Sequence, residues 1–299
     1  MAAFMTRQFY KQRADFEASC EGRDQRFTLP EDIDIQTDIP YINDGSNEHL
    51  FDIYRPSSAS DKILPVVINV HGGGLLLGNK EFNKFFCAQL SAMGYVIFSI
   101  EYRLIPDCEI YDQFADVSAA CTFINRHLAE YLGNPEQIYG VADSGGACLL
   151  NYAAAMSNCH RIAKAAHTAP PDIQFQALGY ISGMFYTNRF DKIGLFLPKY
   201  LYGKNYKKQA FAPYINPEHP DIINALPPCL LITSYHDHLK RYTLSYVKAL
   251  NRHHARYKLL NFPKKPKLTH AFSVFEPDLK ESSYVIKKLH HFFTKYGEK

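Results

Sequence analysis

Short apolar runs alternate with longer amphipathic runs from about residue 50 to the C-terminus. The short runs are rich in β-branched residues and have the length of strands, while the longer runs repeat their apolar positions at helical spacing. This alternation is typical of an α/β fold, a mostly parallel sheet with helices on both faces. The predicted strands are 49–56, 65–70, 95–102, 137–142, 175–183, 229–234 and 257–262. The predicted helices are 81–94, 111–132, 147–157, 242–253 and 281–295.

Two stretches, residues 1–45 and about 184–222, do not follow this alternation. Ligands of open α/β sheets bind at the carboxyl ends of the strands, so segments outside the sheet are candidates to cover that edge. We therefore predict an N-terminal cap segment over 1–45 and an α/β domain over 46–299 with a cap insertion at about 184–222. The insertion is rich in aromatic side chains, which we expect mainly to pack the cap and together to give the entrance an apolar, aromatic wall. They are Phe185, Tyr186, Phe190, Phe196, Tyr200, Tyr202, Tyr206, Phe211 and Tyr214.

Composition narrows the class of protein. The 33 Lys and Arg against 30 Asp and Glu give a net charge of only +3, which argues against nucleic acid as the principal partner. No apolar run approaches the ~20 residues of a membrane-spanning helix, and charge interrupts the N-terminus before a signal-peptide core could form. The seven cysteines are odd in number and contain no C-x-x-C pair, which favours reduced thiols in the cytoplasm over disulfides or a zinc site.

The octapeptide VADSGGAC, residues 141–148, carries the first candidate for chemistry. Ser144 follows a predicted buried strand by one turn and precedes a predicted helix, which is the context of a nucleophile elbow. Glycines at 145 and 146 remove the Cβ atoms that would collide at such a sharp reversal. The alternative is an ordinary turn serine, and the octapeptide alone would favour it. The surrounding residues decide in favour of a nucleophile.

A serine nucleophile needs a base, and the base needs a carboxylate that orients it. Asp237 follows the predicted strand 229–234, and His270 follows the last predicted strand, 257–262. The chain order Ser144, Asp237, His270 is the order of the α/β-hydrolase topology and differs from the chymotrypsin and subtilisin orders. These three residues are therefore predicted to form a catalytic triad.

The segment HGGG, residues 71–74, supplies backbone amides without side chains at the end of the predicted strand 65–70. Such amides can stabilise the oxyanion of a tetrahedral intermediate. We predict that Gly72, Gly73 and Gly145 donate to it. The rival interpretation is a phosphate-binding loop, since four residues separate Gly73 from Gly78, as they separate the two glycines of that motif. Asn79 and Lys80 stand where that motif requires Lys and Ser or Thr, so the rival fails.

Together, HGGG, EYRLIPD (101–107), the D-S-G-G around Ser144 and the later Asp and His resemble the hormone-sensitive-lipase branch of the α/β-hydrolases, from about residue 48 to the C-terminus. The resemblance implies hydrolysis of carboxylic esters by this triad and oxyanion hole, with no cofactor and no metal, under a cap formed by the N-terminus and an insertion. One departure is that the family usually has G-D-S-A-G-G, whereas this chain has Ala142 two residues before Ser144 and glycine after it. The added methyl is expected to tighten or tilt the elbow slightly.

Other residues compete for these roles. The histidine pairs 253–254 and 290–291 lie on predicted helices and are expected at the surface. Asp278 and Glu276 come after His270 and break the expected order. His236 and His238 flank Asp237, and this triplet could ligate a metal, but no second ligand cluster supports it.

We therefore predict a cytoplasmic serine carboxylesterase that acts on short-chain acyl or aryl esters, with a small-molecule ester as its partner and a homo-oligomer left open. Two other functions use the same scaffold. A receptor-like protein that binds a small molecule is disfavoured because His270 is present, whereas the receptors of the resembled family have lost the triad histidine. An amide or peptide hydrolase would use identical residues.

Overall fold

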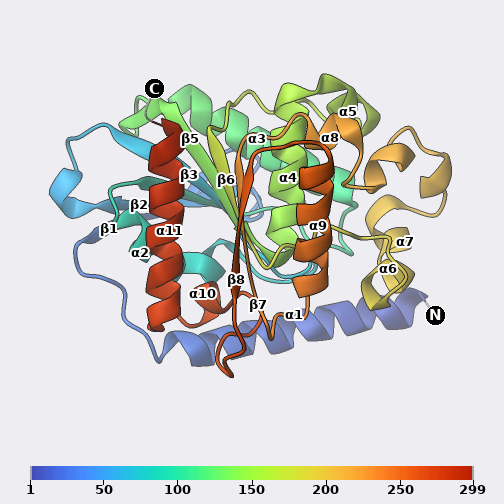
Figure 1. Cartoon of the computed structure of the whole chain (residues 1–299), viewed down its shortest axis with the longest axis horizontal. Helices are drawn as coiled ribbons and strands as arrows, with labels where there is room; N and C mark the ends of the chain where they lie inside the picture. Colours follow the sequence, from blue (N-terminus) through green and yellow to red (C-terminus); the bar gives the residue numbers. More distant parts are fainter. Residues whose placement is uncertain (1, 298–299) are drawn as a thin grey trace.

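The computed structural model describes residues 2–297 and contains one eight-stranded sheet in the order β1-β2-β4-β3-β5-β6-β7-β8 (Figure 1). Strand β2 is antiparallel to both of its neighbours, and all pairs from β4 to β8 are parallel. The strands are β1 Ile33–Pro40, β2 Leu50–Pro56, β3 Leu64–Val70, β4 Val96–Ile100, β5 Gly133–Asp143, β6 Ala177–Ile181, β7 Cys229–Ser234 and β8 Tyr257–Phe262.

Helices cover both faces of the sheet, as the alternating sequence pattern predicts. Successive residues of β3 show why, because Val66 and Ile68 belong to one hydrophobic core and Val67 to the other. A central parallel strand is therefore apolar on both faces. One face carries α2 (Lys84–Ser91) and α11 (Lys280–Gly297). The other carries α3 (Ile110–His127), α4 (Ser144–Asn158) and α9 (Lys240–Arg252) (Figure 1). The predicted fold class, an α/β sheet covered on both faces, is confirmed.

Strand β1 corrects one detail of the sequence analysis, because it lies within the segment predicted to be outside the sheet. Ile33 is its one buried residue at the edge of the sheet, and the remaining positions are exposed or half-buried. A register shift between Gln36 and Ile39 interrupts its pairing with β2. The boundary at residue 45 therefore does not separate the cap from the sheet.

Helix α1 (Ala2–Asp24) runs along one end of the sheet (Figure 1). Arg13 holds it there by donating to the carbonyls of Leu76 and Ile105 and by pairing with Asp107 at 3.1 Å. Phe9 is buried and packs edge-on against Tyr200 at 5.2 Å. The first helix therefore contacts both the loop after β3 and the insertion.

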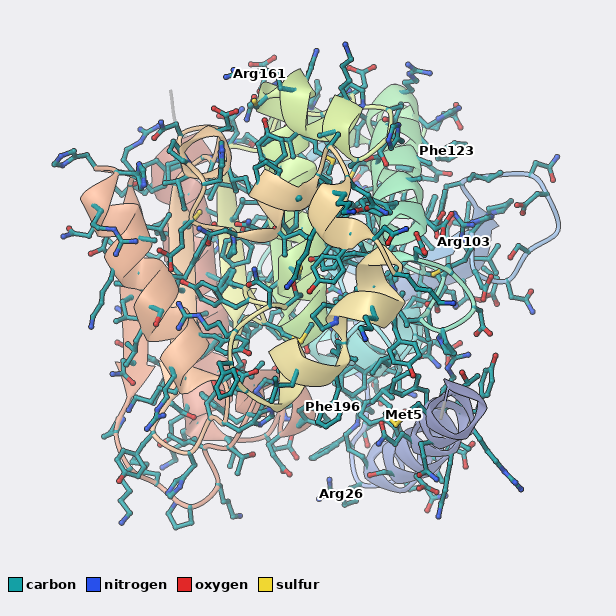
Figure 2. All side chains as sticks on the ribbon, turned by 90° about the vertical axis from the view of Figure 1, so that its right-hand side faces the viewer. Met5, Arg26, Arg103, Phe123, Arg161 and Phe196 are labelled. Carbon is teal, nitrogen blue, oxygen red and sulfur yellow. The ribbon has the colours of Figure 1, made fainter. Side chains whose placement is uncertain are left out.

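The insertion between β6 and β7 contains short helices joined by turns, and Figure 2 shows it facing the viewer. Among the described residues, no helix is both long and apolar enough to span a bilayer. The short elements of this region and of the C-terminal half are α5 (His160–Ala165), α6 (Lys192–Phe196), α7 (Pro198–Tyr202), η3 (Tyr206–Lys208), η4 (Ala212–Ile215), α8 (Pro220–Ile223) and α10 (Phe272–Phe275).

Candidate active site

The turn between β5 and α4 has the geometry predicted for a nucleophile elbow. Ser144 is the first residue of α4 and has a φ of +45°, a left-handed conformation that non-glycine residues adopt rarely and mostly where the structure enforces it. Its side chain lies at the helix N-terminus, which favours developing negative charge. Ala142 lies on β5, which pairs with β3 and β6, and its methyl is buried in a hydrophobic core, so the elbow accommodates the departure from the family motif.

Gly146 permits the close approach of α4 to β3. A Cβ at this position would lie 2.2 Å from the carbonyl oxygen of Val70 and 2.3 Å from that of His71. Both contacts are to backbone, which cannot rotate away as a side chain can. Only glycine fits at position 146 without moving the strand or the helix.

We expect Gly146→Ala to lower the free energy of unfolding by about 3 kcal/mol, because the added methyl overpacks a rigid backbone contact. Urea unfolding followed by circular dichroism measures this change. Gly22→Ala is the matched control, since Gly22 is also helical but has nothing within 4 Å of the added Cβ. That variant should be as stable as the parent or slightly more stable. Equal midpoints for the parent and Gly146→Ala would contradict the packing described here.

Asp237 and His270 lie after β7 and β8, at the same edge of the sheet as Ser144. The Nε2 of His270 is 2.9 Å from the Oγ of Ser144, and its Nδ1 is 2.7 Å from the Oδ1 of Asp237. The three side chains are separated by up to 126 positions in the chain, yet they form one continuous chain of hydrogen bonds. The structure therefore brings together the three residues that the sequence analysis singled out.

Asp237 is 4% exposed and has three hydrogen-bond partners. Besides His270, its oxygens accept from the Thr233 hydroxyl at 2.7 Å and the Leu239 backbone N–H at 2.9 Å. Burial by itself would raise the pKa of this carboxyl, but the hydrogen bonds and the neighbouring His270 outweigh it, and the pKa lies below the ordinary value of 3.8. The group is therefore ionised at neutral pH.

The glycines of the HGGG segment do not all have free amides. The backbone N–H of Gly72 donates to the Oδ1 of Asp143 at 2.9 Å, so it is not available to a substrate oxyanion. Gly73 and Gly74, by contrast, line the cavity beside Ser144 and have φ values of +112° and +63°. The expectation that Gly72 donates is therefore wrong, and Gly74 takes its place among the candidates with Gly73 and Gly145.

A buried polar network supports this loop from behind, and the sequence analysis missed it. Asp143 accepts from both Gly72 and the side-chain amide of Asn83 at 2.9 Å, and Asn83 also donates to Asn69 at 3.1 Å. Burial raises the pKa of the Asp143 carboxyl, while the bonds from Asn83 and Gly72 act in the opposite direction. His71 stacks on Tyr102 at 4.3 Å. No sequence motif marks Asn83, because its role depends on a contact across 60 positions.

Ser144 and His270 line a cavity of about 300 Å³, whereas Asp237 is buried and does not line it. None of the nine aromatic residues expected at the entrance lines it. Four of them are buried in the cap, three are half-buried against it, and Phe190 and Phe196 are exposed. The insertion therefore gives the cavity no aromatic wall, and the three aromatic residues that line it, Phe16, Phe82 and Phe275, come from other elements. Apolar side chains dominate the lining, namely Phe16, Leu76, Leu77, Phe82, Met184, Ile193, Leu197, Leu239 and Phe275.

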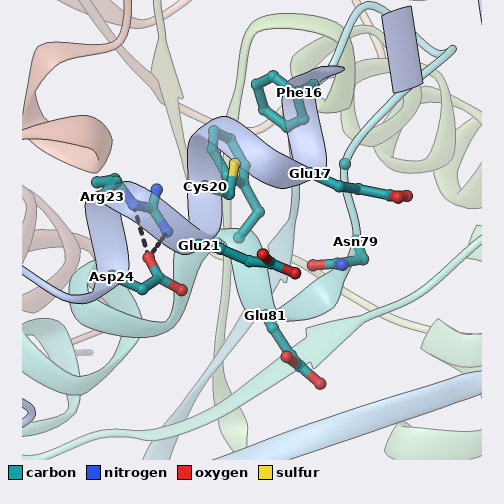
Figure 3. Close-up of a pocket in the computed structure, with 10 residues that line it drawn as sticks. Phe16, Glu17, Cys20, Glu21, Arg23, Asp24, Asn79 and Glu81 are labelled. Atoms are coloured by element: carbon teal, nitrogen blue, oxygen red, sulfur yellow. Dashed lines mark hydrogen bonds and ion pairs between the residues drawn. The ribbon is translucent and has the colours of Figure 1, made fainter. Parts of the chain in front are cut away.

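A smaller cavity of about 230 Å³ lies on the other side of Phe16 and Phe82, which line both spaces. Figure 3 shows its acidic lining from α1 and from the turn before α2, with Arg23 bound to Asp24 at 2.8 and 2.6 Å. Cys20 is the only thiol among its lining residues, and burial raises the pKa of this thiol. This space therefore adjoins the candidate active site, from which Phe16 and Phe82 separate it.

The other candidates from the sequence lie elsewhere or are already engaged. His290, on α11, is hydrogen-bonded to Tyr95 at 3.0 Å, and Glu276 lies 3.8 Å from Arg26. His238 stacks on His270 at 4.1 Å, and donor atoms of Asp237, His238 and His270 lie within 4.8 Å of one another. Two of these three residues, Asp237 and His270, are hydrogen-bonded to each other at 2.7 Å.

Comparisons with known proteins give the chain a family. The family model BD-FAE matches residues 51–246, which is more than half of the chain. "Carboxylesterase NlhH" of Mycobacterium tuberculosis is 28% identical over 236 residues, covering 74% of this chain and 70% of the relative. "Esterase LipQ" of the same organism is 32% identical over 124 residues, covering 41% of this chain. A "Probable isoprenylcysteine alpha-carbonyl methylesterase ICMEL1" of Arabidopsis thaliana is 33% identical over 113 residues, covering 38% of this chain.

The matched regions cover only 29% of the length of Esterase LipQ and 23% of the length of the Arabidopsis methylesterase. Solved structures agree on the fold over nearly the whole chain. Esterase B from Lactobacillus rhamnosis superposes with a TM-score of 0.92 at 20% identity, covering 100% of this chain and 97% of that one. An esterase from Pyrobaculum calidifontis superposes with a TM-score of 0.73 at 21% identity, covering 96% and 93%. The predicted α/β-hydrolase fold and the resemblance to its esterases are confirmed.

Proposed function

Because the chain belongs to the BD-FAE family, we propose that it is a serine carboxylesterase with Ser144 as the nucleophile, His270 as the base and Asp237 as the orienting carboxylate. The observation that carries this proposal is the continuous hydrogen-bond chain, 2.9 Å from Ser144 to His270 and 2.7 Å from His270 to Asp237. The first distance allows direct proton transfer between the Ser144 hydroxyl and the imidazole, and the second allows Asp237 to orient the imidazole.

In the first half of the reaction, the Oγ of Ser144 attacks the ester carbonyl carbon while His270 takes the hydroxyl proton. The tetrahedral intermediate collapses, the C–O bond to the alcohol breaks, and His270 returns the proton to the leaving alcohol. Water then attacks the acyl-enzyme by the same sequence and releases the acid. Asp237 stabilises the imidazolium that forms in each half, which requires the ionised carboxyl that its lowered pKa supplies.

We assign the oxyanion hole to the backbone N–H groups of Gly73, Gly74 and Gly145. Gly73 and Gly74 line the cavity, and Gly145 directly follows the nucleophile. Asp143 supports the hole indirectly, since its bond to Gly72 fixes the loop that carries the two donors. The loss of one such donor typically lowers turnover by ~10²–10³-fold.

The cavity suggests the class of ester. Its volume of about 300 Å³ is small for a ligand site, and its lining is mainly apolar. Short acyl chains and small aryl groups fit these properties, and we propose such uncharged esters as substrates.

We also propose that α1 and residues 184–222 together form the cap. Phe16 of α1 and three residues of the insertion, Met184, Ile193 and Leu197, line the cavity from above the sheet edge. All seven cysteines, which lie among the described residues, are free of disulfides, which supports the proposed cytoplasmic location.

The test is a series of p-nitrophenyl esters from two to twelve carbons, run beside a fluorophosphonate probe and the matching p-nitroanilides. We expect the highest kcat/KM on the shortest acyl chains, covalent labelling of Ser144, and slower hydrolysis of the anilides because an amine is harder to expel. A protein that binds the esters but neither hydrolyses them nor becomes labelled would be a receptor, and the proposal would be wrong. Faster cleavage of the anilides would reassign it to amide hydrolysis.

A further inference from the structure

Three apolar side chains on the cap face solvent. Phe190 is 94% exposed, Phe196 is 59% exposed and Leu195 is 58% exposed, although neighbouring aromatic residues of the same segment are buried. We call these three residues the cap patch. A cap that buries Phe185, Tyr202 and Phe211 but leaves these side chains in water has an unused apolar surface, which in soluble proteins commonly marks an interaction site.

The cap around the patch is strongly basic. Four lysines of the insertion are exposed, and none of them forms an ion pair among the residues that the structure describes. The one acidic residue between positions 189 and 210 is Asp191, whose carboxylate already accepts from Tyr242 and from the backbone of Gly194. From another element, the carboxylate of Glu109 lies beside Gly203, so the cap surface carries more lysines than carboxylates but is not free of negative charge. The four lysines are Lys199, Lys204, Lys207 and Lys208.

The patch adjoins the entrance of the candidate active site. Phe190 and Leu195 line a surface hollow of about 460 Å³ together with Lys207, on one side of α6. On the other side of the same short helix, Ile193 and Leu197 line the catalytic cavity. Figure 2 shows Phe196 at the end of the cap nearest to helix α1, where Met5 is labelled. Helix α6 thus separates the exposed apolar surface from the reaction space.

We propose that the cap patch docks onto an anionic lipid surface, with Phe190, Leu195 and Phe196 inserted at the interface and the lysines facing the lipid headgroups. Exposed aromatic residues flanked by lysines are the combination that binds the boundary between headgroups and acyl chains. A second copy of the chain fits this surface less well, because the lysines of the two copies would face each other. Docking would bring the entrance of the cavity next to esters dissolved in the lipid.

The test measures binding, so it does not depend on catalysis. The full chain is sedimented with vesicles of phosphatidylcholine alone and with vesicles that also contain phosphatidylglycerol. We expect binding to the mixed vesicles, at least tenfold weaker binding to pure phosphatidylcholine, and a loss of binding at high salt because exposed charges are screened.

Two double variants locate the surface. Phe190→Ser with Phe196→Ser, and Lys207→Glu with Lys208→Glu, should each weaken binding to the mixed vesicles by about tenfold or more. Matched controls lie away from the cap. Ile63→Ser removes an apolar side chain that is 68% exposed at the amino end of β3, and Lys287→Glu with Lys288→Glu reverses two exposed charges on α11. Both controls should bind like the parent.

Equal binding by the parent and both cap variants would overturn the proposal, as would equal affinity for the two kinds of vesicle. A cap variant that shifts the molar mass in light scattering would overturn it too, because the patch would then be a contact between copies. Circular dichroism and hydrolysis of dissolved p-nitrophenyl acetate report whether each variant is folded and active. A parent chain that binds vesicles without hydrolysing any ester would refute the esterase proposal and leave the docking proposal intact.

Discussion

Replacing Ser144 with alanine should lower kcat for p-nitrophenyl acetate by about 10⁴- to 10⁶-fold and leave the fold unchanged. In the proposed mechanism, the substitution removes the atom that forms the covalent bond to the acyl group, and the residual rate would come from the oxyanion hole and from binding. The removed hydroxyl has one described side-chain partner, His270, so little stability should be lost. Initial rates at saturating ester and thermal unfolding by circular dichroism measure the two effects.

Ser157→Ala is the matched control. Ser157 lies on the same helix, α4, and its hydroxyl bonds only to the carbonyl of Ala154 among the described contacts. That variant should retain the parent rate. A Ser144→Ala protein that remains as active as the parent would rule out Ser144 as the nucleophile, whatever its distance to His270.

Asp237→Asn should lower kcat by about 10⁴-fold. An asparagine amide can donate to the Nδ1 of His270, which would leave the proton on Nε2, the nitrogen that faces Ser144. The imidazole could then no longer accept the hydroxyl proton. The measurement is kcat as a function of pH, and Asp278→Asn is the control, because this exposed carboxyl was the alternative in the sequence and should have no effect.

Asp237→Asn should also change how the stability of the folded state depends on pH in acid. The folded-state pKa of Asp237 lies below its ordinary value of 3.8, so ionisation of this group stabilises the folded state at pH values above 3.8. This stabilisation is lost as the pH falls through the lowered pKa. The difference in urea midpoint between the parent and Asp237→Asn should therefore shrink below pH 3.8. A difference that stays constant down to the lowest pH at which the chain folds would contradict the pKa shift.

The sheet and most helices could be predicted because buried parallel strands are apolar on both faces and amphipathic helices repeat at 3.6 residues. Strand β1 was not predicted, because it is not apolar on both faces. Its isoleucines at 33, 35 and 39 alternate, but the polar residues between them and the register shift after Gln36 weaken the pattern. An edge strand buries one side at most, so its sequence resembles a loop.

The amino-acid sequence determined the identity and order of Ser144, Asp237 and His270, because the α/β-hydrolase topology places the ends of these particular strands at one edge. It could not determine which glycine amide is free, since the bond from Gly72 to Asp143 joins residues 71 positions apart. It also could not determine the walls of the cavity, where Phe16, Phe82 and Phe275 come from three separate elements. The local sequence pattern determines secondary structure. The hydrogen-bond partner of a backbone amide and the neighbours of an aromatic ring depend instead on which surfaces meet when the helices pack on the sheet.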